Sequence, residues 1–218
     1  MIPQNQSSRY AQRLRKVFQI QEKIKDIHRL LNKAFAIAIV SDGVLMIFEA
    51  DPLQKGYFHV KNTPTHMPIP NCVRAAFPIE SFDNRAVCVV SEDVFESIEG
   101  YAAIFHEFVH CFQWETCEEK LKMTLGVAQK AMAEGNISWE LDYPFPYHDP
   151  DFIKDYSLFA RALQTNEADE IRRHRDTLKK TLGRRDCDYM IWQEWKEGFA
   201  RLIENRIRRR LDIPENHS

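Results

Sequence analysis

The chain has 218 residues, of which 44% are apolar and 28% are charged, with only 7 Gly and 10 Pro. This composition is typical of an ordered globular protein and excludes extensive disorder. Thirty basic residues face 32 acidic ones, so the formal net charge of -2 gives no overall reason to expect binding to nucleic acid or to an anionic membrane.

The N-terminal residues MIPQNQSSRYAQRLRK lack the apolar core and cleavage site of a secretory signal. The longest purely apolar run, AFAIAIV at residues 34–40, is too short to cross a bilayer. The five cysteines show no CxxC spacing, so we expect reduced thiols rather than a disulfide framework. These features favour a soluble, cytoplasmic protein.

The first half of the chain predicts one helix followed by a small sheet. Apolar residues at three- and four-residue steps indicate a helix over about residues 8–32. The apolar runs at 34–40 and 44–50 flank Ser-Asp-Gly, which favours a hairpin because Gly43 can adopt positive φ. Further short strands are expected near YFHV, near CVRAAF and at RAVCVV (85–90), the last either at an edge of the sheet or inside it.

The second half predicts helices only. The expected helices cover about residues 97–114 and 118–134, then from Pro150 to about 163, 166–182 and 188–211. Asp149 and Pro150 are suitable as a helix cap and first-turn residue, and Gly183 is a stop signal. A helix, a mainly antiparallel sheet and then a helical half indicate the α+β class. We expect a single domain over 1–218, with a helix-plus-sheet part (1–96), a helical part (97–211) and a tail (212–218).

The stretch AAIFHEFVHCFQW (102–114) contains the candidate metal ligands and the candidate general base. His106 and His110 are four residues apart and lie side by side on a helix, where both imidazoles can bind one Zn²⁺. Glu107 lies about 100° round the helix and can take a proton from a metal-bound water as general base. Helical projection separates a face with Tyr101 and Phe105 from the histidine face, so the site is expected to point away from the core.

A catalytic zinc site usually has a third protein ligand, and the sequence offers only carboxylates downstream. The carboxylates that could supply the third ligand are, in chain order, Glu115, Glu118, Glu119, Glu167, Asp169, Glu170, Glu194, Glu197 and Glu204.

The segment EGFARLIE (197–204) resembles the EGxA element of gluzincin metallopeptidases, notably the aminopeptidase-N-like group. The resemblance, together with HEFVH, implies a zincin-like fold, one Zn²⁺ per chain and Glu197 as the third ligand beside His106 and His110. The competing element TNEADE (165–170) faintly resembles thermolysin-like enzymes and offers Glu167 or Glu170. Glu194 is a further alternative. The chain departs from the aminopeptidase pattern by a long segment between His110 and Glu197 and by the lack of an element that binds a free amino terminus.

An oxyanion-stabilising side chain is expected near the metal, and Tyr147, His148 and Tyr189 are the candidates. The sequence RIRRR (206–210) is interpreted as a solvated helix end, because no aromatic residues alternate with the arginines.

We expect a zinc-dependent hydrolase that cleaves a peptide or protein substrate, with Glu107 as general base and with neither nucleic acid nor membrane as partner. The alternatives are a catalytically inactive zincin-fold binding or regulatory protein, or a helical nucleic-acid-binding protein.

Overall fold

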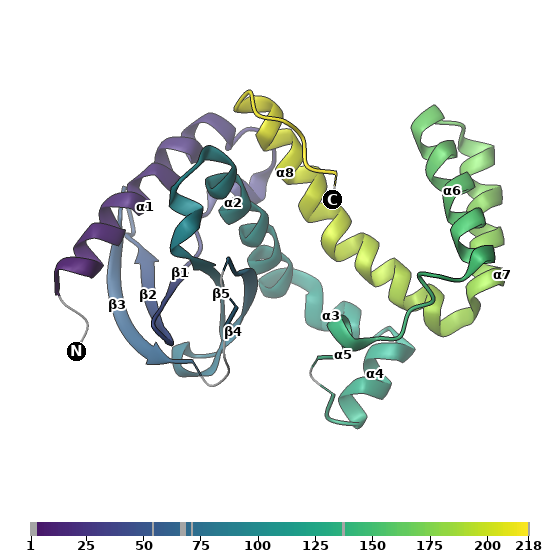
Figure 1. Ribbon diagram of the computed structural model, residues 1–218, viewed down its shortest axis with the longest axis horizontal. Coiled ribbons are helices and arrows are strands. Elements are labelled where there is room, and N and C mark those ends of the chain that lie inside the picture. Colours follow the sequence, from purple (N-terminus) through teal and green to yellow (C-terminus); the bar gives the residue numbers. More distant parts are fainter. Residues whose placement is uncertain (1–3, 54, 66–68, 71, 137, 218) are drawn as a thin grey trace. The chain divides into compact units, whose positions relative to one another are not determined.

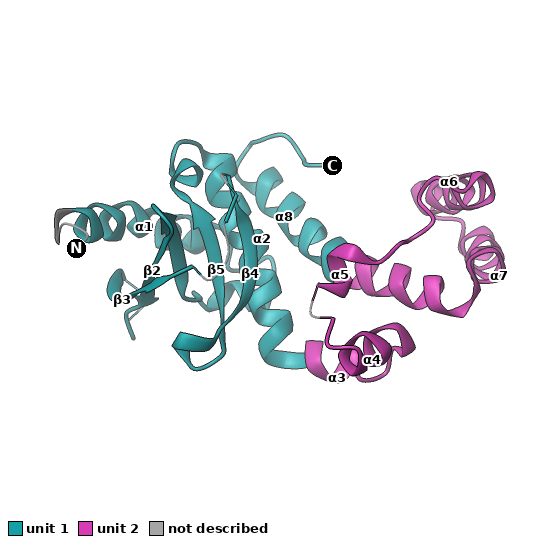
Figure 2. Cartoon of the chain, turned by 60° about the horizontal axis from the view of Figure 1, so that its bottom comes forward, with its two compact units in different colours: residues 1–117, 196–218 teal, residues 118–195 magenta. Residues whose placement is uncertain are grey.

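The computed structural model describes residues 4–53, 55–65, 69–70, 72–136 and 138–217. The fold is α+β, as the order of predicted elements indicated. The chain forms two compact units (Figure 2): unit 1 comprises Met1–Cys117 and Lys196–Ser218, and unit 2 comprises Glu118–Trp195. The boundaries between the units fall at residues 117/118 and 195/196. The helices on both sides of unit 2 in the sequence belong with the sheet.

The sheet of unit 1 has five strands in the order β3-β2-β1-β5-β4. Only β1 and β5 are parallel, and the other neighbouring pairs are antiparallel, so the sheet is mainly antiparallel as expected. The strands span Ile37–Ser41 (β1), Val44–Ala50 (β2), Tyr57–Pro64 (β3), Arg74–Ile79 (β4) and Arg85–Ser91 (β5).

The predicted hairpin joins β1 to β2. Ser41 pairs with Val44, so Asp42 and Gly43 form a two-residue turn. Both have positive φ, 50° and 73°, which is the requirement of the turn type that matches the twist of antiparallel strands.

The strand RAVCVV, for which the sequence left both positions open, lies inside the sheet as β5, and β4 forms the edge. The amide of Ser91 donates to the carbonyl of Val73, so the residues that hydrogen-bond to β5 are Val73 and, at two-residue steps, Ala75 and Phe77. The backbone groups of the residues between them, Arg74 and Ala76, therefore point away from the sheet. Pro78, which also points away, has no N–H and limits the length of this free edge.

Helices α1 (Gln4–Ile24), α2 (Ile98–Gln113) and α8 (Phe199–Arg210) pack with one face of the sheet into the main core of unit 1 (Figure 1). Residues such as Leu14, Phe105 and Ile203 are fully or almost fully buried there with alternate residues of β1, β2 and β5. The expected first helix ends at Ile24, and a separate 3-10 helix covers Arg29–Asn32. The opposite face of the sheet has a smaller apolar cluster around Ile47 and Val89.

Unit 2 is helical. Its helices span Glu119–Lys122 (α3), Gly126–Ala133 (α4), Trp139–Asp142 (α5), Pro150–Thr165 (α6) and Ala168–Gln193 (α7). The helix expected over 118–134 is broken between α3 and α4. Asp149 caps α6 as predicted, because its side chain accepts hydrogen bonds from the amides of Asp151 and Phe152. The helix predicted to stop at Gly183 does end there, because this residue has non-helical backbone angles (φ 69°, ψ 175°), and a second helical stretch of α7 continues to Gln193.

The chain leaves unit 1 within a π-helical segment, Trp114–Glu118, and returns to it within a second one, Glu194–Gly198. π-helical turns are rare and occur often at functional sites. The last expected helix is therefore divided into the end of α7, this segment and α8. Within the part of the chain that the structure describes, no helix is long and apolar enough to cross a bilayer.

Candidate metal centre

Helix α2 separates its core face from its polar face as the projection predicted. Ser97 caps the helix, its hydroxyl accepting a hydrogen bond from the amide of Gly100. Tyr101, Phe105 and Phe108 are buried in the main core of unit 1. The packing of this aromatic face fixes the rotation of the helix and thereby the direction of the two histidines.

Three potential metal-binding atoms converge where α2 approaches the start of α8. The Nε2 atoms of His106 and His110 are 3.1 Å apart, and each lies 3.5 Å from Oε2 of Glu197. Ligands that lie about 2.0–2.1 Å from a tetrahedral Zn²⁺ are separated from one another by about 3.3 Å. The triangle of donors therefore has the size of one face of a zinc tetrahedron. Among the described residues, these three form the cluster of His, Cys, Asp and Glu side chains that is suited to hold a metal ion.

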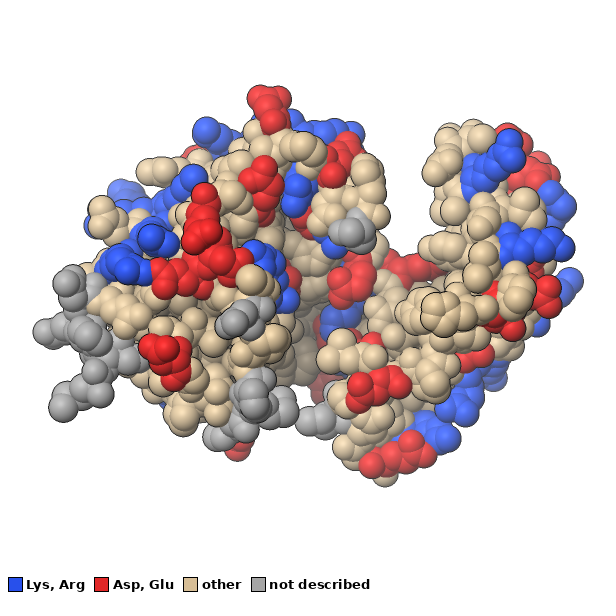
Figure 3. All heavy atoms as spheres, viewed as in Figure 1, with Lys and Arg blue, Asp and Glu red and all other residues tan. Residues whose placement is uncertain are grey.

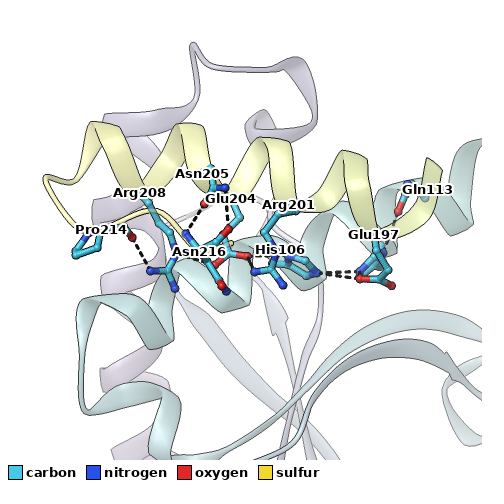
Figure 4. A network of polar contacts seen from close by, with 10 residues as sticks. His106, Gln113, Glu197, Arg201, Glu204, Asn205, Arg208, Pro214 and Asn216 are labelled. Carbon is cyan, nitrogen blue, oxygen red and sulfur yellow. Dashed lines mark hydrogen bonds and ion pairs between the residues drawn. The ribbon is translucent and has the colours of Figure 1, made fainter. Parts of the chain in front are cut away.

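The opposite ring nitrogens of both histidines are held by acceptors. Nδ1 of His106 lies 2.9 Å from Oε2 of Glu204, and Nδ1 of His110 lies 2.9 Å from Oε1 of Gln113 (Figure 4). A carboxylate or amide oxygen at Nδ1 selects the tautomer whose proton is on Nδ1, which leaves the Nε2 lone pair for a metal. Both imidazoles are therefore prepared as ligands through Nε2.

Glu204 is the most heavily bonded of these groups. It is 2% exposed, and its carboxylate accepts hydrogen bonds from Arg201 Nη1 at 2.5 Å and from Arg208 Nε at 2.7 Å in addition to the one from His106. Although burial raises the pKa of Glu204, the hydrogen bonds from His106 and Arg208 outweigh burial and lower it to about 2. The carboxylate is thus anionic and is a fixed acceptor for His106.

In the metal-free protein, charge holds the cluster together. Burial lowers the pKa of His106, but hydrogen bonds to Glu197 and Glu204 outweigh burial and raise it to about 9. The same contacts hold the pKa of Glu197 well below its usual range despite its own desolvation. A metal ion bound between the two rings would displace a proton from Nε2 of His106.

Glu107 lines the same pocket as two of the three donor residues, His106 and Glu197. This pocket has a volume of about 470 Å³ and is also lined by Arg201 and others from unit 1. Glu107 is 6% exposed, and burial raises the pKa of its carboxyl group. Within the described part of the chain its carboxylate has no hydrogen-bond partner, so it is available to a molecule in the pocket.

Of the other candidate ligands from the sequence, Glu115 and Glu204 lie in unit 1, where Glu115 pairs with Lys33, and the rest lie in unit 2. Glu194 forms a bidentate salt bridge with Arg175, whose Nη1 and Nη2 donate to the carboxylate at 2.8 and 2.6 Å. Glu170 pairs with Arg173, and Glu167 occupies the N-terminal cap position of α7. The structure brings none of the candidates in unit 2 into the histidine cluster.

The three oxyanion candidates also belong to unit 2 and are not among the residues that line the pocket. Tyr189 is buried in the unit 2 core, and its hydroxyl donates to the carbonyl of Glu140 at 2.9 Å. Tyr147 and His148 are exposed. The charged donors that line the pocket are instead Arg74, Arg201 and Arg208.

The roles of Glu204 and Gln113 were missed in the sequence, although Glu204 was one of the candidate carboxylates. Spacing carries a signal for both. Glu204 follows Glu197 by seven residues, which is two helical turns on the same face. Gln113 follows His110 by three residues, so the side chains are neighbours on α2.

The arginines of RIRRR are largely paired within unit 1. Arg208 binds Glu204, Arg209 pairs with Glu215 at 2.9 Å, and Arg210 binds Asp26. Acidic and basic side chains are intermixed on the face of unit 1 seen in Figure 3. These arginines therefore contribute to the stability of unit 1.

Comparison of the chain with protein-family models, with curated proteins and with solved structures gave no match.

Proposed function

We propose that the protein is a zinc-dependent hydrolase of the metallopeptidase type, with His106, His110 and Glu197 as ligands of one Zn²⁺ in a zincin-like unit 1. The observation that carries the proposal is the convergence of two Nε2 atoms and one carboxylate oxygen within 3.1–3.5 Å. Two buried histidines that were hydrogen-bonded to each other through Nε2 for structural reasons alone would not need an acceptor at each Nδ1. Histidines that bind a metal usually have such an acceptor.

A bound Zn²⁺ lowers the pKa of a water molecule and polarises a carbonyl group. Glu107 would be the general base that accepts a proton from water and would deliver it to the leaving amine, because it is next to the ligands, faces the pocket and has no competing hydrogen bond. Burial raises the pKa of Glu107, which makes its carboxylate a stronger base than an exposed glutamate. Glu204 and Gln113 orient the rings, and three protein ligands leave a fourth position for the substrate.

The edge strand β4 supports a peptide as the substrate. The backbone groups of Arg74 and Ala76 point away from the sheet, and the Arg74 side chain lines the pocket of the candidate metal centre. An extended peptide can add to such an edge through main-chain hydrogen bonds. The strand RAVCVV (85–90) lies inside the sheet, so β4 is the strand that offers this edge.

Metal analysis of protein purified without a histidine tag tests the proposal. We expect close to one zinc per chain in the wild type and in Glu107→Gln, and loss of zinc in Glu197→Ala. Glu194→Gln, which removes the charge of an alternative ligand in unit 2, is the matched control and should retain the metal. Absence of zinc from both purified and zinc-soaked wild type would refute the proposal.

Activity is tested with a mixed-peptide library, with Glu107→Gln as the blank. Cleavage by the wild type alone supports the hydrolase. If zinc binds but the library is not cut, the protein is a binding or regulatory module with the same metal centre.

A further inference from the structure

The segment that follows α8 turns back along that helix. Asp212 has positive φ (56°), and the amides of Asp212 and Ile213 donate to the carbonyls of Arg209 and Arg208. This pattern is a Schellman motif, which ends a helix and reverses the chain. Ile213 then packs against the main core of unit 1 and anchors the segment.

Two side chains of α8 bind the backbone of this segment. The Asn205 side chain donates from Nδ2 to the carbonyl of Asn216 at 2.9 Å and accepts from the amide of Asn216 at 2.7 Å (Figure 4). Arg208 donates from Nη1 to the carbonyl of Pro214 at 2.9 Å. On the segment, these hydrogen bonds involve only main-chain atoms, so they do not depend on which side chains stand at 214 and 216.

The bound segment reaches the pocket of the candidate metal centre. Asn216 and Arg208 line that pocket together with His106, Glu107 and Glu197. Arg208 also holds Glu204, which in turn accepts the hydrogen bond from His106. The backbone-binding side chains and the metal ligands are thus parts of one continuous network along α8.

We propose that Asn205 and Arg208 form a recognition site for the backbone of an extended peptide. In this structure residues 214–216 occupy the site, and they compete for it with a peptide that is not part of the chain. An asparagine that donates to and accepts from the same residue satisfies the two main-chain groups that an extended strand presents on one side. With the segment bound, Asn205 is only 9% exposed, so the two hydrogen bonds to Asn216 are largely shielded from water. The proposal deepens the proposed function, on which it rests for the identity of the peptide as substrate.

The segment can be displaced without changing the site. In the double variant Ile213→Asp/Glu215→Arg, the first substitution removes the apolar anchor and the second replaces the ion pair with Arg209 by repulsion. Faster hydrogen exchange of the Asn216 amide will report the displacement, because this amide is bonded to Asn205 in the wild type.

The probe is a fluorescent, N-acetylated and C-amidated peptide with the sequence of residues 212–217, titrated into metal-free protein. We expect binding to the double variant and at least about tenfold weaker binding to the wild type, in which the internal segment occupies the site. Asn205→Leu in the double variant should abolish binding.

The peptide itself supplies the matched control. N-methylation at the position of Asn216 removes the hydrogen donated to Asn205 and should weaken binding about tenfold, whereas N-methylation at the position of His217 should not. If exchange shows the segment displaced and the peptide still fails to bind, or if both methylated peptides bind alike, the proposal is overturned. The titration needs neither metal nor catalysis, so its result is separate from that of the zinc assay.

Discussion

Replacement of Glu204 by glutamine tests whether this residue positions His106 and at the same time stabilises unit 1. In the wild type the carboxylate accepts from His106, Arg201 and Arg208, and its side chain is 3% exposed. Glutamine has one acceptor oxygen, so its NH₂ group must face one of these donors. A hydrogen bond to a charged partner contributes about 1.5–3 kcal/mol, and we expect the free energy of unfolding to fall by about 3 kcal/mol.

The same change should weaken zinc binding. Loss of the acceptor behind a ligand histidine typically lowers metal affinity by about 10–100-fold. Zinc affinity is measured by competition with a chromogenic chelator, and the stability of the metal-free protein by urea unfolding.

Glu197→Gln is the comparison variant. The Glu197 side chain is 53% exposed, so its loss should change the stability of the metal-free protein by less than about 1 kcal/mol while removing a ligand. The two variants thus separate a structural acceptor from a metal ligand. If Glu204→Gln bound zinc as tightly as wild type and unfolded at the same urea concentration, the role that we assign to Glu204 would be wrong.

Three further predictions concern the scaffold. In Gly100→Ala a Cβ would lie 2.1 Å from the carbonyl oxygen of Val94, so we expect a loss of about 2–3 kcal/mol in urea unfolding. Asp149→Ala removes the cap of α6 and should lower the free energy of unfolding by about 1 kcal/mol in the same assay. Unchanged stability would contradict this prediction. Burial and then the hydrogen bond to Asp186 raise the pKa of Tyr143 to about 12, so its contribution is present below pH 10 and is lost as pH rises towards 12. Stability measured between pH 10 and 12 should therefore fall less steeply in Tyr143→Phe than in wild type.

Local sequence signals predicted those parts of the fold that depend on neighbouring residues. The turn at Asp42 and Gly43 and the cap at Asp149 follow from the conformational preferences of single residues, and both were predicted correctly. The position of β5 inside the sheet was not predictable, because it depends on a parallel pairing with β1, which is distant in sequence.

The candidate site shows the same distinction. The pairing of His106 with His110 follows from helical periodicity alone, whereas Glu197 was suggested by a resemblance and not by any distance along the chain. The role of Glu204 emerges only when α2 lies against α8, because a carboxylate beside an arginine on a helix otherwise indicates a solvated pair. Gln113 is a neighbour of His110 on α2 itself, so its contact is local. The boundaries of unit 2 fall within helical segments and carry no glycine- or proline-rich linker that would have indicated them.

Unit 1 is assembled from two stretches of the chain, and this has a consequence for its biosynthesis. The sheet, α1 and α2 are made first, but Ala200, Ile203 and Ile207 of α8 complete their core only after unit 2 has been translated. Until then, part of the apolar surface of α2 has no partner, and nascent chains of this kind are at risk of aggregation. Glu197 and Glu204 arrive with the same helix, so a ribosome-bound chain that ends before residue 196 should hold zinc through two histidines at best.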